Sequence, residues 1–100
     1  MAIIQEQHWL KDGLDTDMDS SGLITHRESC IIKYDEVVAT GPDAISDSGF
    51  EIGQEHRDNV NLYLNGDIKA SPIDEDNGAV WRYDLVYTTN GFNVTIDSGL

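Results

Sequence analysis

Turn-forming dipeptides recur at short intervals along the chain and limit the length of any regular element. Glycine follows aspartate, serine or asparagine at 12–13, 21–22, 48–49, 65–66, 77–78 and 90–91. Asn-Gly is the strongest of these signals, because both central residues of a type I′ hairpin turn need a positive φ. Segments this short accommodate strands but few long helices. The sequence therefore predicts a mainly β fold.

The chain has 100 residues, the size of one domain with a modest core. No repeat, low-complexity tract or linker divides it, so we expect a single domain over residues 1–100. Within it we expect an N-terminal arm and acidic turn at 1–23, followed by strands at 24–97. The expected architecture is a small β-sandwich or partly open barrel built from hairpins, with any helix limited to one or two turns.

The clearest strand pattern lies in the last third of the chain. Large apolar residues alternate with mostly polar ones at Trp81, Tyr83, Leu85 and Tyr87, which is the period of a half-buried strand. A two-residue loop at 90–91 would pair this strand with residues 92–97 and place the large apolar side chains on one face. The sequence thus predicts a hairpin over 80–97.

Two further regions carry weaker signals. A hairpin around 65–66 would pair Tyr63 with Ile68, and the acidic segment 71–79 is expected to form an exposed loop. Residues 24–40 fit two elements. As a strand, Cys30, Ile32 and Tyr34 share a face; as a helix, Ile31, Tyr34 and Val38 align.

Residues 17–28, DMDSSGLITHRE, match the twelve-residue calcium loop of an EF-hand. The candidate metal ligands, at loop positions 1, 3, 5, 7, 9 and 12, are Asp17, Asp19, Ser21, Leu23, Thr25 and Glu28. The flanks differ from that family, since Gly13 interrupts the entering helix and no second loop follows. Aspartate, serine and glycine are also typical of exposed turns. We expect an acidic turn that leads into a strand, with a calcium-binding module as the alternative.

Charge and composition narrow the range of functions. Six basic and nineteen acidic residues give a formal charge of −13, which disfavours direct binding to nucleic acid or to an anionic membrane. No apolar run or signal-type N-terminus is present, so we expect the chain to stay where it is made. The single cysteine, Cys30, is expected to be a small buried side chain. His56 is expected to lie in a loop, and no zinc spacing or catalytic pair is visible, so we expect no enzyme and no cofactor.

The order of features from about residue 24 to 89 resembles small β-rich structural proteins of tailed bacteriophage virions. The similarity rests on a first strand, an I-G-x-x-H turn within "EIGQEH", and a closing aromatic strand, "AVWRYDLVYTT". Arg57 stands where a proline often follows that histidine. The resemblance implies a structural role in a capsid, neck or tail, with copies of itself and other virion proteins as partners in a homo-oligomeric assembly.

Three function classes follow from these features. The first is a virion structural protein that docks through exposed strand edges and turns. The second is a calcium-binding module at residues 17–28. The third is an acidic regulatory or inhibitor protein that mimics the charge of nucleic acid.

Overall fold

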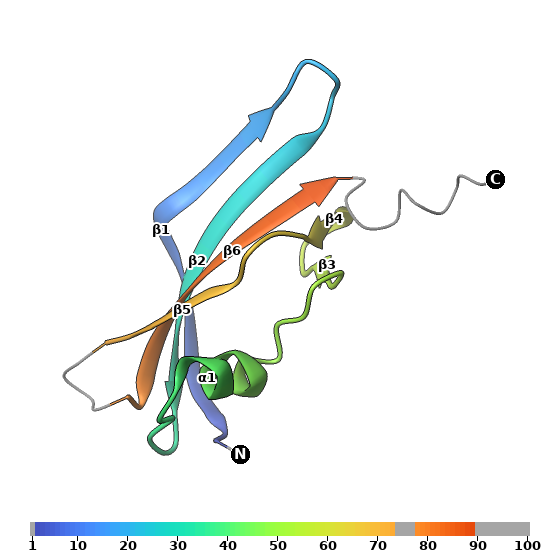
Figure 1. Ribbon diagram of the computed structural model, residues 1–100. Helices are drawn as coiled ribbons and strands as arrows, with labels where there is room; N and C mark the ends of the chain where they lie inside the picture. The colour runs from blue at the N-terminus through green and yellow to red at the C-terminus, as the bar shows by residue number, and fades with distance from the viewer. Residues whose placement is uncertain (1, 74–77, 90–100) are drawn as a thin grey trace.

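The computed structural model describes residues 2–73 and 78–89 (Figure 1). The protein is mainly β, and one curled antiparallel sheet forms a half-barrel. The elements in this part of the chain are β1 (Ile4–Met18), β2 (Ile24–Tyr34), α1 (Gly41–Ser48), β3 (Glu55–His56), β4 (Asn59–Leu64), β5 (Lys69–Pro72) and β6 (Val80–Thr89). The expected mainly β fold is confirmed, in the form of a partly open barrel.

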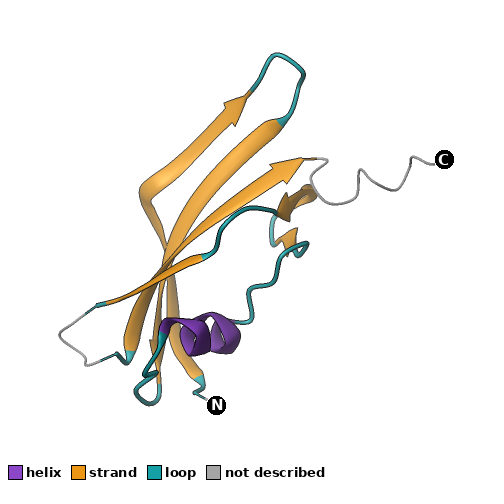
Figure 2. Cartoon of the chain, in the orientation of Figure 1, coloured by secondary structure: helices purple, strands orange, loops and turns teal. Residues whose placement is uncertain are grey.

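Strands β1 and β2 form a long antiparallel hairpin that projects past the end of β6 (Figure 2). The N-terminal arm expected for residues 1–23 is therefore wrong for residues 4–18, which are a strand. Its side chains are mostly exposed on both faces, so its sequence lacks the alternation of a half-buried strand. The acidic turn at 19–23 is confirmed as an exposed connection into β2.

A large bulge, with four residues of β1 opposite one residue of β2, interrupts the β1–β2 ladder. Leu10 lies opposite Ser29 and Asp15 opposite Arg27, so that residues 11–14 face Glu28 alone. Gly13 has a φ of +88° there, and a Cβ atom at this position would lie 2.9 Å from the Ser29 Oγ. The positive φ favours glycine here, and any larger residue would also force the Ser29 hydroxyl to move.

Strand β6 lies in the middle of the sheet, whose order is β1-β2-β6-β4-β3 with β5 also on β6. It pairs with β2 along one edge and with β4 and β5 along the other. Because β4 and β5 follow one another along the same edge, the expected pairing of Tyr63 with Ile68 is wrong. The Asn-Gly at 65–66 instead lies in the connection from β4 to β5, where Asn65 donates its N–H to the Val86 carbonyl at 2.8 Å.

The expected hairpin over 80–97 is described only in its first half, since residues 90–97 lie outside the described residues. Both edges of β6 are occupied by β2, β4 and β5. The predicted face is confirmed, because Trp81, Tyr83, Leu85 and Tyr87 are each at most 4% exposed. The loop expected at 71–79 is wrong for residues 71 and 72, which belong to β5, and the Ile73 N–H donates to the Val80 carbonyl at 2.9 Å. Residues 74–77 lie outside the described residues.

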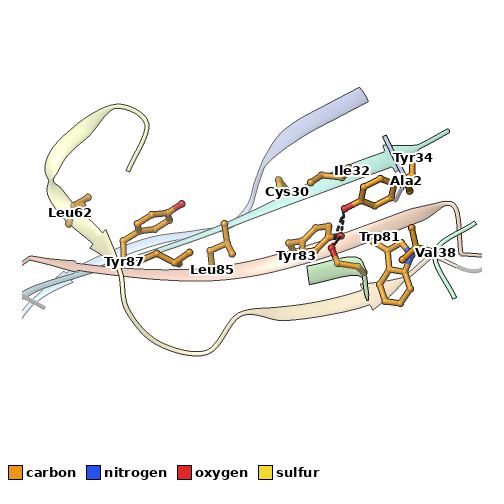
Figure 3. Close-up of a cluster of buried hydrophobic side chains, with 12 residues drawn as sticks. Ala2, Cys30, Ile32, Tyr34, Val38, Leu62, Trp81, Tyr83, Leu85 and Tyr87 are labelled. Atoms are coloured by element: carbon orange, nitrogen blue, oxygen red, sulfur yellow. Dashed lines mark hydrogen bonds between the residues drawn. The ribbon is translucent and has the colours of Figure 1, made fainter. Parts of the chain in front are cut away.

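The core fills the concave face of the sheet (Figure 3). Residues 24–34 are a strand, and Cys30, Ile32 and Tyr34 are buried on its inner face. The hydroxyls of Tyr34 and Tyr83 contact each other and lie 3.3 and 2.8 Å from the Ala44 carbonyl oxygen of α1. These contacts hold the helix against the sheet. The helix has only eight residues, as expected for an element limited to about two turns. No helix among the described residues has the length and apolar character needed to cross a membrane.

Candidate functional site

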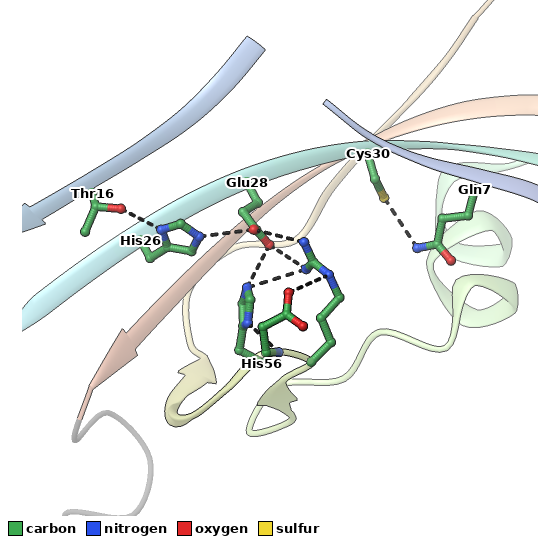
Figure 4. A network of polar contacts seen from close by, with 8 residues as sticks. Gln7, Thr16, His26, Glu28, Cys30 and His56 are labelled. Atoms are coloured by element: carbon green, nitrogen blue, oxygen red, sulfur yellow. Dashed lines mark hydrogen bonds and ion pairs between the residues drawn. The ribbon is translucent and has the colours of Figure 1, made fainter. Parts of the chain in front are cut away.

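A buried carboxylate and four nitrogen donors form a polar cluster on the inner face of the sheet (Figure 4). The Glu28 side chain is only 7% exposed. Arg57 Nη1 donates to its Oε1 at 2.8 Å and Arg57 Nη2 to its Oε2 at 3.2 Å. His56 Nε2 lies 3.0 Å from Oε1, and His26 Nε2 lies 3.1 Å from Oε2. Both oxygens are therefore fully engaged.

The strand geometry places these groups. His26 and Glu28 are two residues apart on β2, so they point to the same face of the sheet. His56 ends the short strand β3, which turns back into β4 with His56 opposite Asn59. Arg57 follows directly in that turn, and its guanidinium carbon lies 3.6 Å from the centre of the Trp9 ring of β1. The cluster thus ties β3 to both strands of the long hairpin.

The hydrogen bonds define the protonation of the two histidines differently. His56 Nδ1 accepts the Asp58 backbone N–H at 3.0 Å, so the ring proton lies on Nε2 and is donated to Glu28. His26 Nδ1 lies 2.6 Å from the Thr16 Oγ1, a hydroxyl that can either donate or accept. His26 can therefore keep both of its contacts with or without a proton on Nδ1, whereas His56 cannot.

The surroundings keep Glu28 ionised. Burial alone raises the pKa of a carboxyl, but hydrogen bonds from Arg57 and His26 and the positive charge of Arg57 outweigh it, and the pKa of Glu28 falls to about 2. Efficient general bases have a pKa near the working pH. A carboxylate with this pKa and no free oxygen serves better as a structural anion or as a ligand for a cation than as a proton acceptor.

A pocket of about 500 Å³ opens beside the cluster. Both histidines line it, together with the apolar Ile24 and Leu62 and polar side chains that include Asn61. The rings of His26, His56 and Tyr87 pack edge to face or tilted, with centroids 4.8–6.4 Å apart. The aromatic contacts fix the orientation of the histidines, and the pocket gives solvent and small ligands access to them.

The structure brings together only three of the calcium ligands expected at residues 17–28, which are Asp19, Ser21 and Leu23. Asp19 Oδ1 accepts the Ser21 N–H, the Ser21 hydroxyl and the Leu23 N–H at 2.9, 2.7 and 3.0 Å. The Leu23 carbonyl, the expected ligand at loop position 7, accepts the Asp19 N–H at 3.0 Å. These contacts build the exposed turn itself and lower the pKa of Asp19, chiefly through the Ser21 hydroxyl.

The other three expected ligands lie on the paired strands. Asp17 is opposite Thr25 in the hairpin, and its carboxylate binds Arg27 at 3.1 Å. Glu28 lies four residues into β2, about 13 Å along the strand from its start. Its carboxylate faces the inner cluster. The structure therefore does not bring Glu28 together with the oxygens of the turn.

Sequence reasoning missed the cluster. His56, expected in a loop, is a buried residue at the end of β3. The His-x-Glu spacing at 26–28 is a local signal that two polar groups share the inner face of a strand. His56 and Arg57 are 28 and 29 residues away from Glu28 and carry no such signal.

Comparison with known proteins adds no relative. No family model matches the sequence, and no curated protein or solved structure is significantly similar to it. The function must therefore be inferred from the architecture and its chemistry.

Proposed function

We propose that this protein is a non-enzymatic structural component of a tailed-phage virion that acts through contacts with other proteins. The free edge of β1 is the observation that carries this proposal. β1 is the outermost strand of the sheet and has 15 residues, with β2 on one side and no strand on the other among the described residues. The unpaired N–H and C=O groups of such an edge are a template for an added strand.

The side chains of β1 support a protein partner. Only Trp9 and Leu10 are half-buried, and the rest of the strand is exposed. Leu14 and Met18 are 50% and 66% exposed, although apolar side chains of this size gain free energy when a partner covers them. The net charge of −13 repels nucleic acid, so the partners we propose are copies of this chain and other virion proteins.

The cluster around Glu28 is consistent with a structural role. All four of its donors satisfy a buried carboxylate that would otherwise be costly to desolvate. The cluster connects residues from β1, β2 and the turn after β3, and so holds the projecting hairpin against the body of the half-barrel. A rigid hairpin presents its free edge in one orientation.

The decisive experiment is mass spectrometry on purified particles of the source phage. We expect this 11.1 kDa chain at a stoichiometric copy number. Leu14→Glu and Met18→Glu should reduce its incorporation, because both place a charge on the β1 edge. Val60→Glu on β4 should not, although Val60 is 64% exposed, close to the 66% of Met18. Absence of the chain from particles would reject the proposal.

The acidic regulatory protein is the alternative that the net charge favours. It requires a stable monomer that binds a basic host protein and is absent from particles, which the same purification and a pull-down would reveal. The calcium-binding alternative loses support from the geometry, because Glu28 is engaged by Arg57 and both histidines.

A further inference from the structure

Three side chains of the cluster carry a donor set that suits a transition-metal ion. Three ligand atoms lie within 4.8 Å of one another, one each from His26, Glu28 and His56. Two imidazole nitrogens and one carboxylate are typical of zinc and iron(II) sites, whereas calcium and magnesium prefer oxygen ligands alone. Ligands about 2.0–2.2 Å from a tetrahedral ion are about 3.3–3.6 Å apart. His56 Nε2 lies 3.0 Å from Glu28 Oε1 and His26 Nε2 lies 3.1 Å from Glu28 Oε2, so each imidazole is near that spacing from one oxygen of the carboxylate.

Arg57 supplies the positive charge at this place. Its Nη1 lies 2.8 Å from Glu28 Oε1 and 3.5 Å from His56 Nε2, so the guanidinium sits between two of the three ligand groups. A divalent ion bound to the same two atoms would repel this guanidinium at short range. Metal and arginine are thus alternative occupants of one anionic position.

We propose that His26, Glu28 and His56 form a latent transition-metal site, which a zinc-like ion occupies when Arg57 leaves Glu28. Binding at His56 Nε2 requires the ring proton on Nδ1, which now accepts the Asp58 N–H. Arg57 and Asp58 are consecutive residues of the turn after β3, so one displacement of this turn releases both contacts. This proposal does not depend on the role of the protein in a particle.

The remaining features of the site are already suited to a metal. His26 needs only to move its ring proton from Nε2 to Nδ1, where the Thr16 hydroxyl can accept it, as partners of metal-bound histidines commonly do. The pocket of about 500 Å³, lined by His26 and His56, gives the ion an entry path and room for a water at the fourth position. The displaced turn is the main cost of binding.

The test titrates tag-free protein with Zn²⁺ by calorimetry and with Co²⁺ by visible absorption. We expect one ion per chain, a tetrahedral cobalt spectrum and a higher melting temperature with zinc. Tryptophan fluorescence should change in parallel, because Arg57 stacks at 3.6 Å on the ring of Trp9, one of the two tryptophans of the chain. His26→Gln should abolish the cobalt spectrum. His8→Gln, at an exposed histidine on β1, should leave it unchanged.

The sharpest variant is Arg57→Gln, which removes the competing cation and keeps all three ligands. It should tighten metal binding by about 10–100-fold, the range typical of changes in groups that contact metal ligands. Near-UV circular dichroism without metal shows whether each variant is folded. Equal affinity in folded Arg57→Gln and in the unaltered protein would overturn the proposal, as would an undiminished cobalt spectrum in His26→Gln.

Discussion

Replacing Glu28 with glutamine should destabilise the fold in a pH-dependent way. The pKa of Glu28 falls from its usual 4.5 to about 2 in the folded protein. Each pKa unit corresponds to about 1.4 kcal/mol, so the folded environment favours the anion by about 3 kcal/mol. The side chain is only 7% exposed, so solvent screening reduces this figure little. The stabilisation is complete above pH 4.5 and is lost as the pH falls towards 2.

The measurement is urea unfolding of the unaltered protein and of Glu28→Gln at several pH values between 7 and 2.5. The difference in unfolding free energy should be about 3 kcal/mol at pH 7 and should shrink steadily below pH 4.5. Glu51→Gln, at an exposed carboxylate after α1, serves as the matched control and should change stability by less than about 0.5 kcal/mol. A difference that is the same at every pH, or below about 1 kcal/mol at pH 7, would refute the argument.

Three further variants or reactions probe the fold. Trp81→Ala should lower the unfolding free energy by about 3–5 kcal/mol, because the ring is only 4% exposed; an unchanged melting temperature would contradict the face assignment of β6. Gly13→Ala should lower the unfolding free energy by about 2–3 kcal/mol, more than Gly22→Ala, because both glycines have a positive φ but only at Gly13 would a Cβ atom contact Ser29. Equal losses of stability in thermal melts would show that this contact is unimportant. Burial raises the pKa of Cys30 to about 11, so alkylation at pH 8 should be slow until denaturant unfolds the chain, and rapid labelling of the native protein would show that the thiol is accessible.

The parts of the fold that the sequence predicts are those with one buried face. The alternation of Trp81, Tyr83 and Leu85 identifies β6, and that of Cys30 and Ile32 supports a strand at β2, because burial against the core selects every second side chain. Strand β1 cannot be identified in this way. It is held mainly by backbone pairing with β2, and apart from Trp9 and Leu10 its side chains are exposed, so no alternating pattern marks it in the sequence.

The candidate site is predictable only in part for a related reason. His26 and Glu28 share a face as soon as β2 is recognised as a strand. His56 and Arg57 reach them through β4 and β6, a path set by tertiary pairing. Asn65-Gly66 illustrates the same limit, since its preference for positive φ suits a connection between strands on one edge as well as a hairpin turn, and only the position of β6 decides between them.

The central position of β6 has a consequence for the order in which the protein folds. β6 holds β2, β4 and β5 together, although it is the last of these strands to be synthesised. Before it emerges from the ribosome, only pairings such as β1–β2 and β3–β4 can form. The sheet therefore has a high contact order, and domains dominated by such distant pairings fold in milliseconds to seconds. During translation the apolar faces of β2 and β4 stay exposed until β6 is synthesised, so cellular chaperones have an opportunity to bind the incomplete half-barrel.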